Sequence, residues 1–181
     1  MYELERKVRA SHSDVRARLE RCGATPTETV VQEDIYWNHP SRNFVDTDEA
    51  LRTRRQYEPD HEADGVVRFT YKGPRVDTDT KTRIEREVGV TDGSQLRSML
   101  EALGFEAAGT VRKHRSLFVE GDINICLDEV DGIGEFVELE THAPPGDLET
   151  ARSAVDALAG ELGLADAESV TSSYLELVLE Q

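Results

Sequence analysis

The chain has 181 residues and a formal net charge of −16. It contains no run of about 18 apolar residues, which argues against a helical membrane span. The excess of acidic residues argues against a nucleic-acid-binding surface, which would need Lys and Arg to neutralise phosphates. The length predicts a single domain over residues 1–181, large enough to bury a core. The first residues are charged and do not form the apolar stretch of a signal peptide. Only two cysteines are present, Cys22 and Cys126, which argues against a disulfide framework and favours a reducing, cytoplasmic location. Neither cysteine belongs to a Cys/His cluster, so no zinc site is expected.

Lysine is scarce, since only four of the 21 basic residues are Lys. An acidic, lysine-poor surface is typical of proteins that work in high salt, although a GC-rich genome that favours Arg would leave the same pattern. If the chain is halophilic, its melting temperature should rise from dilute salt to several molar KCl because salt screens the repulsion between carboxylates. Equal stability at all KCl concentrations would contradict this hypothesis.

Alternation and helical periodicity predict the elements in chain order. Residues 2–10 alternate as a strand, and a helix capped by Ser11 or Ser13 runs to Cys22, before Gly23. Further strands are expected over 27–38, 50–57, 66–72 and 80–90, then a helix over 93–103, strands over 110–119, 122–130 and 135–142, and helices over 147–163 and 169–179. The loops between the second, third and fourth strands cover 39–48 and an acidic stretch at 59–65.

This order predicts an α+β fold that is mainly β. The strands follow one another like hairpins, with too few crossover helices for a parallel, doubly wound sheet. We therefore expect a strongly curved or closed antiparallel sheet with the helices packed outside.

Charged side chains recur at alternating positions of the predicted strands. The rows are Glu3, Glu5 and Lys7; Arg52 and Arg54; Arg68 and Lys72; Lys81, Arg83, Glu85 and Glu87; Lys113 and Arg115; Asp128; and Glu138 and Glu140. For a single strand the ordinary interpretation is a solvent-exposed face. Across all strands, the near-exclusive use of Arg, Lys and Glu favours a different interpretation, in which helices cover the outside and the charged rows line the lumen.

A lumen of mixed charge is costly unless a ligand pairs with its side chains. A polyphosphate with a divalent metal would do so, because Arg and Lys bind phosphate oxygens and carboxylates bind hard cations such as Mg²⁺ or Mn²⁺. The sequence lacks a GxxxxGK[ST] motif, which excludes a P-loop enzyme.

The ordered motifs resemble those of the CYTH superfamily, the triphosphate tunnel metalloenzymes. They are Glu3-x-Glu5-x-Lys7, Gln32-x-Asp34-x-Tyr36, Leu51-Arg52-x-Arg54, Thr70-Tyr71-Lys72-Gly73-Pro74, Arg83-x-Glu85-x-Glu87, Lys113-x-Arg115, Leu127-Asp128-x-Val130-x-Gly132-x-Gly134-x-Phe136-x-Glu138-x-Glu140, and Ser173-Tyr174. ExExK alone is a weak signal, whereas the ordered set covers nearly the whole chain and is specific. The Gln32 segment and the turn after Asp128 resemble the CyaB-type class IV adenylate cyclases most closely.

The resemblance implies an eight-stranded antiparallel tunnel that binds a triphosphate with Mg²⁺ or Mn²⁺. By matched position, the metal ligands would be Glu3, Glu5 and Glu138, with Glu140, Glu87 and Glu85 as lesser candidates. The triphosphate would be held by Lys7, Arg52, Arg54, Lys72, Arg83, Lys113 and Arg115. Catalytic roles would fall to Asp128, Lys113 and Glu138. A homodimer is compatible with the resemblance.

Three functions share these residues. The first is a class IV adenylate cyclase-like conversion of ATP to cyclic AMP and pyrophosphate. The second is hydrolysis of inorganic tripolyphosphate, thiamine triphosphate or a nucleoside triphosphate, and the third is non-catalytic sensing of polyphosphate or nucleotide. The first two reactions differ in which end of the triphosphate faces the catalytic metal, and the sequence leaves that orientation open.

Overall fold

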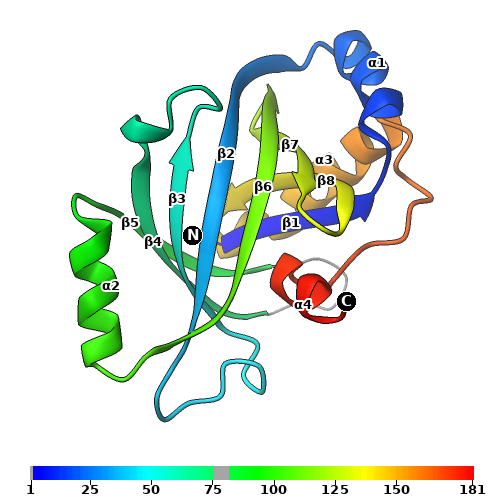
Figure 1. Ribbon diagram of the computed structural model, residues 1–181. Coiled ribbons are helices and arrows are strands. Elements are labelled where there is room, and N and C mark those ends of the chain that lie inside the picture. Colours follow the sequence, from blue (N-terminus) through cyan, green and yellow to red (C-terminus); the bar gives the residue numbers. More distant parts are fainter. Residues whose placement is uncertain (1, 76–81) are drawn as a thin grey trace.

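The structure, a computed structural model, describes residues 2–75 and 82–181. Eight antiparallel strands close into a barrel in the order β1-β5-β4-β3-β2-β6-β7-β8 (Figure 1). The strands are β1 (Tyr2–Arg9), β2 (Thr25–Asn38), β3 (Ala50–Tyr57), β4 (Val66–Arg75), β5 (Arg83–Val90), β6 (Glu106–Glu120), β7 (Ile123–Val130) and β8 (Gly134–Ala143). The predicted closed, mainly β architecture is confirmed, while Lys81 lies outside the described residues.

Four α-helices pack around this barrel in the described part of the chain. They are α1 (His12–Cys22), α2 (Gly93–Ala102), α3 (Leu148–Glu161) and α4 (Tyr174–Leu179), with short 3₁₀ turns η1 (Glu62–Asp64) and η2 (Pro145–Asp147). Gly23 ends α1 in the left-handed conformation (φ 81°), as its predicted role requires. The described residues include no helix that is long and apolar enough to cross a bilayer.

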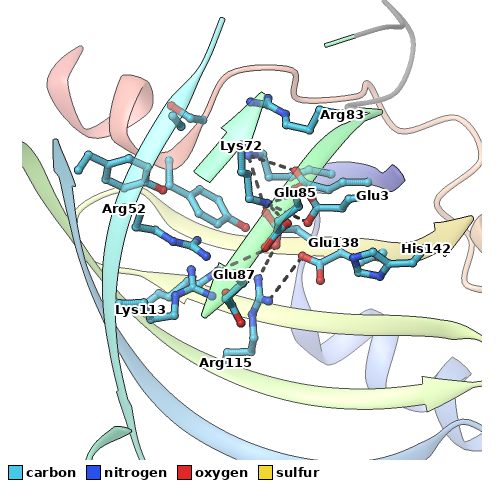
Figure 2. A pocket seen from close by; sticks show the side chains of 18 residues that line it. Glu3, Arg52, Lys72, Arg83, Glu85, Glu87, Lys113, Arg115, Glu138 and His142 are labelled. Atoms are coloured by element: carbon cyan, nitrogen blue, oxygen red, sulfur yellow. Dashed lines mark hydrogen bonds and ion pairs between the residues drawn. The ribbon is translucent and has the colours of Figure 1, made fainter. Parts of the chain in front are cut away.

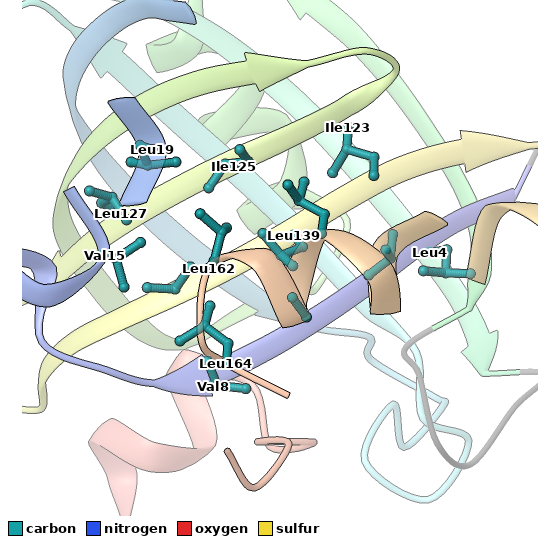
Figure 3. Close-up of a cluster of buried hydrophobic side chains, with 14 residues drawn as sticks. Leu4, Val8, Val15, Leu19, Ile123, Ile125, Leu127, Leu139, Leu162 and Leu164 are labelled. Atoms are coloured by element: carbon teal, nitrogen blue, oxygen red, sulfur yellow. The ribbon is translucent and has the colours of Figure 1, made fainter. Parts of the chain in front are cut away.

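The main hydrophobic core lies outside the barrel, between its wall and two helices. Leu4 and Val8 of β1 point outward, where they meet Val15 and Leu19 of α1 and Leu162 after α3 (Figure 3). Outward residues of β7 and β8 complete this cluster. A second cluster packs α2 against β2, β3 and β4. Because apolar side chains face out toward the helices, the alternate charged side chains of the same strands must face the lumen.

β1 closes the barrel between β8 and β5. It pairs with β8 along its full length, from Tyr2↔Ala143 to Arg9↔Phe136, and within residues 2–75 and 82–181 it pairs with β5 at Tyr2 and Glu3. Farther along the β5-facing side, Val8 bridges Ser169, and the N–H of Val170 donates to the carbonyl of Lys7 at 2.7 Å. The segment before α4 thus covers backbone groups that an edge strand would otherwise expose.

This contact explains one error in the sequence-based prediction. The last helix was expected to begin near residue 169, but it begins at Tyr174. Residues 169 and 170 are instead held in an extended pairing with β1, and Ser173 then starts the helix with a capping box, in which its side chain accepts from the N–H of Glu176. The apolar periodicity of residues 169–179 does not reveal that residues 169 and 170 pair with a strand far away in the sequence.

The helices leave part of the outer wall uncovered. On β5, Ile84 and Val88 point outward and are 40% and 59% exposed. The expectation that helices cover the outer apolar rows therefore holds for β1, β7 and β8 but fails for β5.

Candidate active site

The lumen encloses a cavity of about 220 Å³ that is lined by charged side chains (Figure 2). It brings together all seven residues predicted to hold the triphosphate, namely Lys7, Arg52, Arg54, Lys72, Arg83, Lys113 and Arg115. The six predicted metal ligands, Glu3, Glu5, Glu85, Glu87, Glu138 and Glu140, also line it. Asp128 is fully buried behind the wall of the cavity, where its carboxylate contacts Lys113 and Arg115.

Three carboxylates gather on the two adjacent strands β1 and β8. Glu5 lies directly opposite Glu140 in the strand pairing, and Glu3 follows on the same face of β1. One oxygen from each of Glu3, Glu5 and Glu140 lies within 4.8 Å of the other two. The proximity follows from the pairing of the two strands, because directly opposed side chains of an antiparallel ladder are neighbours.

The electrostatics of this cluster are those of a site that needs a cation. Burial raises the pKa of Glu3 to about 8, although the charge of Lys72 lowers it, and the neighbouring carboxylates add to the rise. Burial likewise raises the pKa of Glu140 to about 6, against the opposing charge of Arg115. A set of carboxylate oxygens suits hard cations such as Mg²⁺ or Mn²⁺, so the residues present fit the metal that the sequence predicts.

Metal binding at this cluster should depend on pH. Because Glu3 keeps its proton up to about pH 8, a divalent cation must displace that proton to bind. We expect the affinity for Mg²⁺ or Mn²⁺ to rise by up to about tenfold per pH unit as pH increases from about 6 to about 8, then to level off. Calorimetric titrations in two buffers of different ionisation enthalpy would measure both the affinity and the released proton. A constant affinity across this range would contradict the assignment of Glu3.

Lys72 bridges the acidic cluster and the basic side of the cavity. Its ammonium lies 2.7 Å from an oxygen of Glu3 and 3.1 Å from one of Glu85. Burial would raise the pKa of Glu85, but Lys72 reverses that effect and lowers it to about 2. Arg83 lines the same cavity, and it stands opposite Glu3 in the β1–β5 pairing.

Asp128 holds two of the predicted phosphate-binding residues in place. Its carboxylate accepts hydrogen bonds from Lys113 at 2.7 Å, from two nitrogens of Arg115 at 2.7 and 2.6 Å, and from the hydroxyl of Tyr174 at 2.9 Å. Burial opposes ionisation, but Arg115 and Lys113 outweigh it and lower the pKa of Asp128. An ionised carboxylate with four donors positions cations well and is a poor base.

Glu138 and Glu87 line the cavity but stand outside the three-carboxylate cluster. Glu138 accepts a short hydrogen bond from Arg115, and its other oxygen lies 3.8 Å from the ammonium of Lys7. Glu87 accepts from the Thr70 hydroxyl at 2.8 Å and from Arg68 at 3.2 Å. Their role as metal ligands remains a prediction, and their present partners are protein donors.

On the opposite side of the barrel, Asp34 of β2 orders two arginines of β3. Arg54 binds its carboxylate through two hydrogen bonds of 2.7 Å, and Arg52 lies 3.6 Å from it. Burial opposes ionisation of Asp34, yet the two arginines hold its pKa well below the usual range. Among the described residues, the buried Nε of Arg52 has no hydrogen-bond partner. Arg52 is therefore better placed than Arg54 to bind an anion in the cavity.

Sequence reasoning assigned no role to several side chains that shape the site. Tyr174 enters the lumen from α4, and its ring lies under the ammonium groups of Lys7 and Lys113, at 4.2 and 4.8 Å. His142 is exposed and also lines the cavity. Asp34 and Tyr174 both belong to motifs quoted above, so their positions in these motifs could have indicated that they are part of the site.

Comparison with known proteins agrees with this geometry. The chain matches the CYTH domain over residues 1–174. A relative from Methanocaldococcus jannaschii is 39% identical over 141 residues, which cover 77% of each chain. It is named provisionally as an adenylate cyclase. A relative from Aeromonas hydrophila named adenylate cyclase CyaB is 29% identical over 181 residues, covering 97% of this chain and 88% of that protein.

Solved structures show the same fold. A Pyrococcus horikoshii OT3 protein superposes with a TM-score of 0.85 and 37% identity, covering 98% of both chains. A more distant Hippeastrum protein, described as having a dominant triphosphatase activity, is 18% identical with a TM-score of 0.66, covers 98% of this chain and 95% of that one, and shares the fold alone. The tunnel, its motifs and these matches lead to one conclusion: the chain belongs to the CYTH domain family and is of the CyaB type.

Proposed function

We propose that this protein is a metal-dependent adenylate cyclase that converts ATP to cyclic AMP and pyrophosphate inside the tunnel. The observation that carries the proposal is the placement of a basic wall and a three-carboxylate cluster in one cavity. A triphosphate needs both, because its negative charge must be balanced by cations from the protein and by a divalent metal. The cyclase names of the two relatives support this choice within the family.

Each group of residues has a role in the proposed reaction. Glu3, Glu5 and Glu140 would hold the metal, which supplies charge neutralisation at the phosphoryl oxygens when it is bound. Arg52 and Lys72 would bind phosphate oxygens, with the other basic residues of the wall. Binding there would fix the chain of phosphates relative to the ribose, which removes much of the entropic barrier of ring closure.

The bonds that change are those at the α-phosphorus. The ribose 3′-oxygen forms a bond to this phosphorus, and the bond from phosphorus to the bridging oxygen of pyrophosphate breaks. The proton of the 3′-hydroxyl ends on the released pyrophosphate, which balances the reaction. Among the predicted catalytic residues, Lys113 and Glu138 line the cavity. Lys113 would stabilise the negative charge that develops on the phosphoryl oxygens, and Glu138 would help to hold the metal. Asp128 would serve the reaction by positioning Lys113 and Arg115.

Hydrolysis of a triphosphate is the competing reaction, because the same cradle could present a terminal phosphorus to water. A product assay separates the two. The protein is incubated in high KCl with Mg²⁺ or Mn²⁺ and, separately, ATP, tripolyphosphate or thiamine triphosphate, and phosphorus species are followed by NMR. Cyclic AMP with pyrophosphate is the expected result. Orthophosphate without cyclic nucleotide would indicate a triphosphatase, and binding without product would indicate a sensor.

A further inference from the structure

Tyr174 stands where the C-terminal segment meets the tunnel. It is 6% exposed, lines the cavity and is the first residue of α4. The centroid of its ring lies 4.2 Å from the ammonium of Lys7 and 4.8 Å from that of Lys113. These two lysines belong to β1 and β6, which are not neighbours in the barrel. One aromatic ring therefore contacts two of the cations that are predicted to hold the triphosphate.

The ring of Tyr174 is held in place from two directions. Its hydroxyl donates to the carboxylate of Asp128 at 2.9 Å, and the ring makes an edge contact with Phe136, at a centroid separation of 5.0 Å. The chain that leads to it is tied to the barrel as well, because the N–H of Val170 donates to the carbonyl of Lys7. The backbone of Lys7 thus anchors the segment whose aromatic ring contacts the side chain of the same lysine.

A carboxylate competes with the phosphates for the same two ammonium groups. One oxygen of Glu138 lies 3.8 Å from the ammonium of Lys7, and its other oxygen lies 3.9 Å from that of Lys113. Both distances exceed the length of a close ion pair, which is about 2.7–2.9 Å. The face of an aromatic ring attracts an ammonium group but, unlike a carboxylate, carries no net charge that cancels it. Contact with Tyr174 therefore favours positions in which the two ammonium groups do not close onto Glu138.

We infer that Tyr174 is a positioning residue for the triphosphate, because its ring holds the ammonium groups of Lys7 and Lys113 where the phosphates can bind them. The inference rests on the proposed function and adds an uncharged residue to the binding site. Without the ring, both ammonium groups would close onto Glu138, and the phosphates would have to break these ion pairs. The hydroxyl has a different role, since its hydrogen bond to Asp128 stabilises the buried cation cluster. Ring and hydroxyl therefore affect different measurements.

The test separates the ring from the hydroxyl. Tyr174→Leu and Tyr174→Met remove both, whereas Tyr174→Phe removes the hydroxyl alone. Calorimetry would measure binding of the α,β-methylene analogue of ATP with Mg²⁺, since this analogue cannot release pyrophosphate. We expect the affinity to fall about tenfold in Tyr174→Leu and Tyr174→Met, because two cation–π contacts in a desolvated site are lost, and to stay within about twofold of the wild type in Tyr174→Phe. Urea unfolding should show a loss of stability in all three, because each lacks the hydroxyl.

Tyr57→Leu is the matched control, because Tyr57 has similar contacts outside the tunnel. It is 7% exposed, its hydroxyl donates to Glu33 at 3.0 Å, and the guanidinium of Arg55 lies 5.0 Å from its ring centroid. Tyr57 is not among the residues that line the cavity. We expect this variant to lose stability and to bind the analogue like the wild type. Melting temperatures would show which variants fold, and one folded variant of Tyr174→Leu and Tyr174→Met is enough for the test.

The possible outcomes separate this inference from the proposed function. An unchanged affinity in Tyr174→Leu or Tyr174→Met, or an equal loss in Tyr174→Phe, would overturn the role of the ring and leave the proposed function standing. A loss of the same size in Tyr57→Leu would show that affinity follows stability alone, and it would overturn the inference as well. If the wild type did not bind the analogue, the proposed function would fail first.

Discussion

Glu5→Gln should abolish metal-dependent turnover while leaving the barrel folded. Glu5 is 8% exposed, and its carboxylate lies in the acidic cluster together with those of Glu3 and Glu140. The amide has nearly the same size but carries no charge, and a hard cation loses an anionic ligand. We expect metal affinity and turnover to fall by more than about 100-fold, because even partners of metal ligands can contribute that much.

The readouts are calorimetric titration with Mn²⁺ and the release of pyrophosphate from ATP. Glu129→Gln provides the control, because Glu129 is exposed on β7 and removal of its charge leaves the tunnel unchanged. Full turnover in Glu5→Gln would show that the cluster on β1 and β8 is not the metal site. The same result would leave the fold and the family assignment intact.

Asp128→Asn should be the most destabilising single substitution in the lumen. The carboxylate is fully buried and accepts from both Lys113 and Arg115. Removal of one partner from a buried ion pair costs about 3–5 kcal/mol, because the remaining charges stay desolvated without compensation. We expect a loss of this size in the free energy of unfolding, with a loss of turnover because both cations lose their position.

Urea unfolding at neutral pH would measure the change. Tyr174→Phe removes one of the hydrogen bonds to the same carboxylate and should cost less, about 1.5–3 kcal/mol. Asp122→Asn is the control for charge alone, since Asp122 is exposed in the turn before β7. If Asp128→Asn changed the free energy of unfolding no more than Asp122→Asn, Asp128 would not be the residue that holds the basic cluster.

The sequence was sufficient to predict which face of each strand is charged. Alternation puts Glu3, Glu5 and Lys7 on one face and Leu4 on the other. The structure agrees, because the three charged residues line the cavity and Leu4 belongs to the outer hydrophobic core. The positions of most elements followed from the same pattern, because periodicity is local. Closure of the barrel was expected from the order of the strands and helices.

The grouping of the carboxylates could not be predicted in the same way. Glu138 and Glu140 share a face, and their separation along β8 is about 7 Å. Glu140 meets Glu3 and Glu5, whereas Glu138 meets Arg115 and lies near Lys7. Which of them meets the acidic cluster depends on the stagger of strands around the barrel. That stagger is a property of the closed sheet and leaves no trace in the spacing of residues along one strand.

The closure of the barrel has a consequence for how the protein folds. β1 precedes β8 by more than 100 residues, yet the two strands pair along the full length of β1, and residues 169 and 170 pair with β1 as well. Closure therefore depends on contacts between the two ends of the chain, which form slowly because a long loop must be ordered before they are gained. We therefore expect the tunnel to close late in folding. Until β8 is available, the β8-facing backbone groups of β1 form an unpaired edge of the kind that favours aggregation.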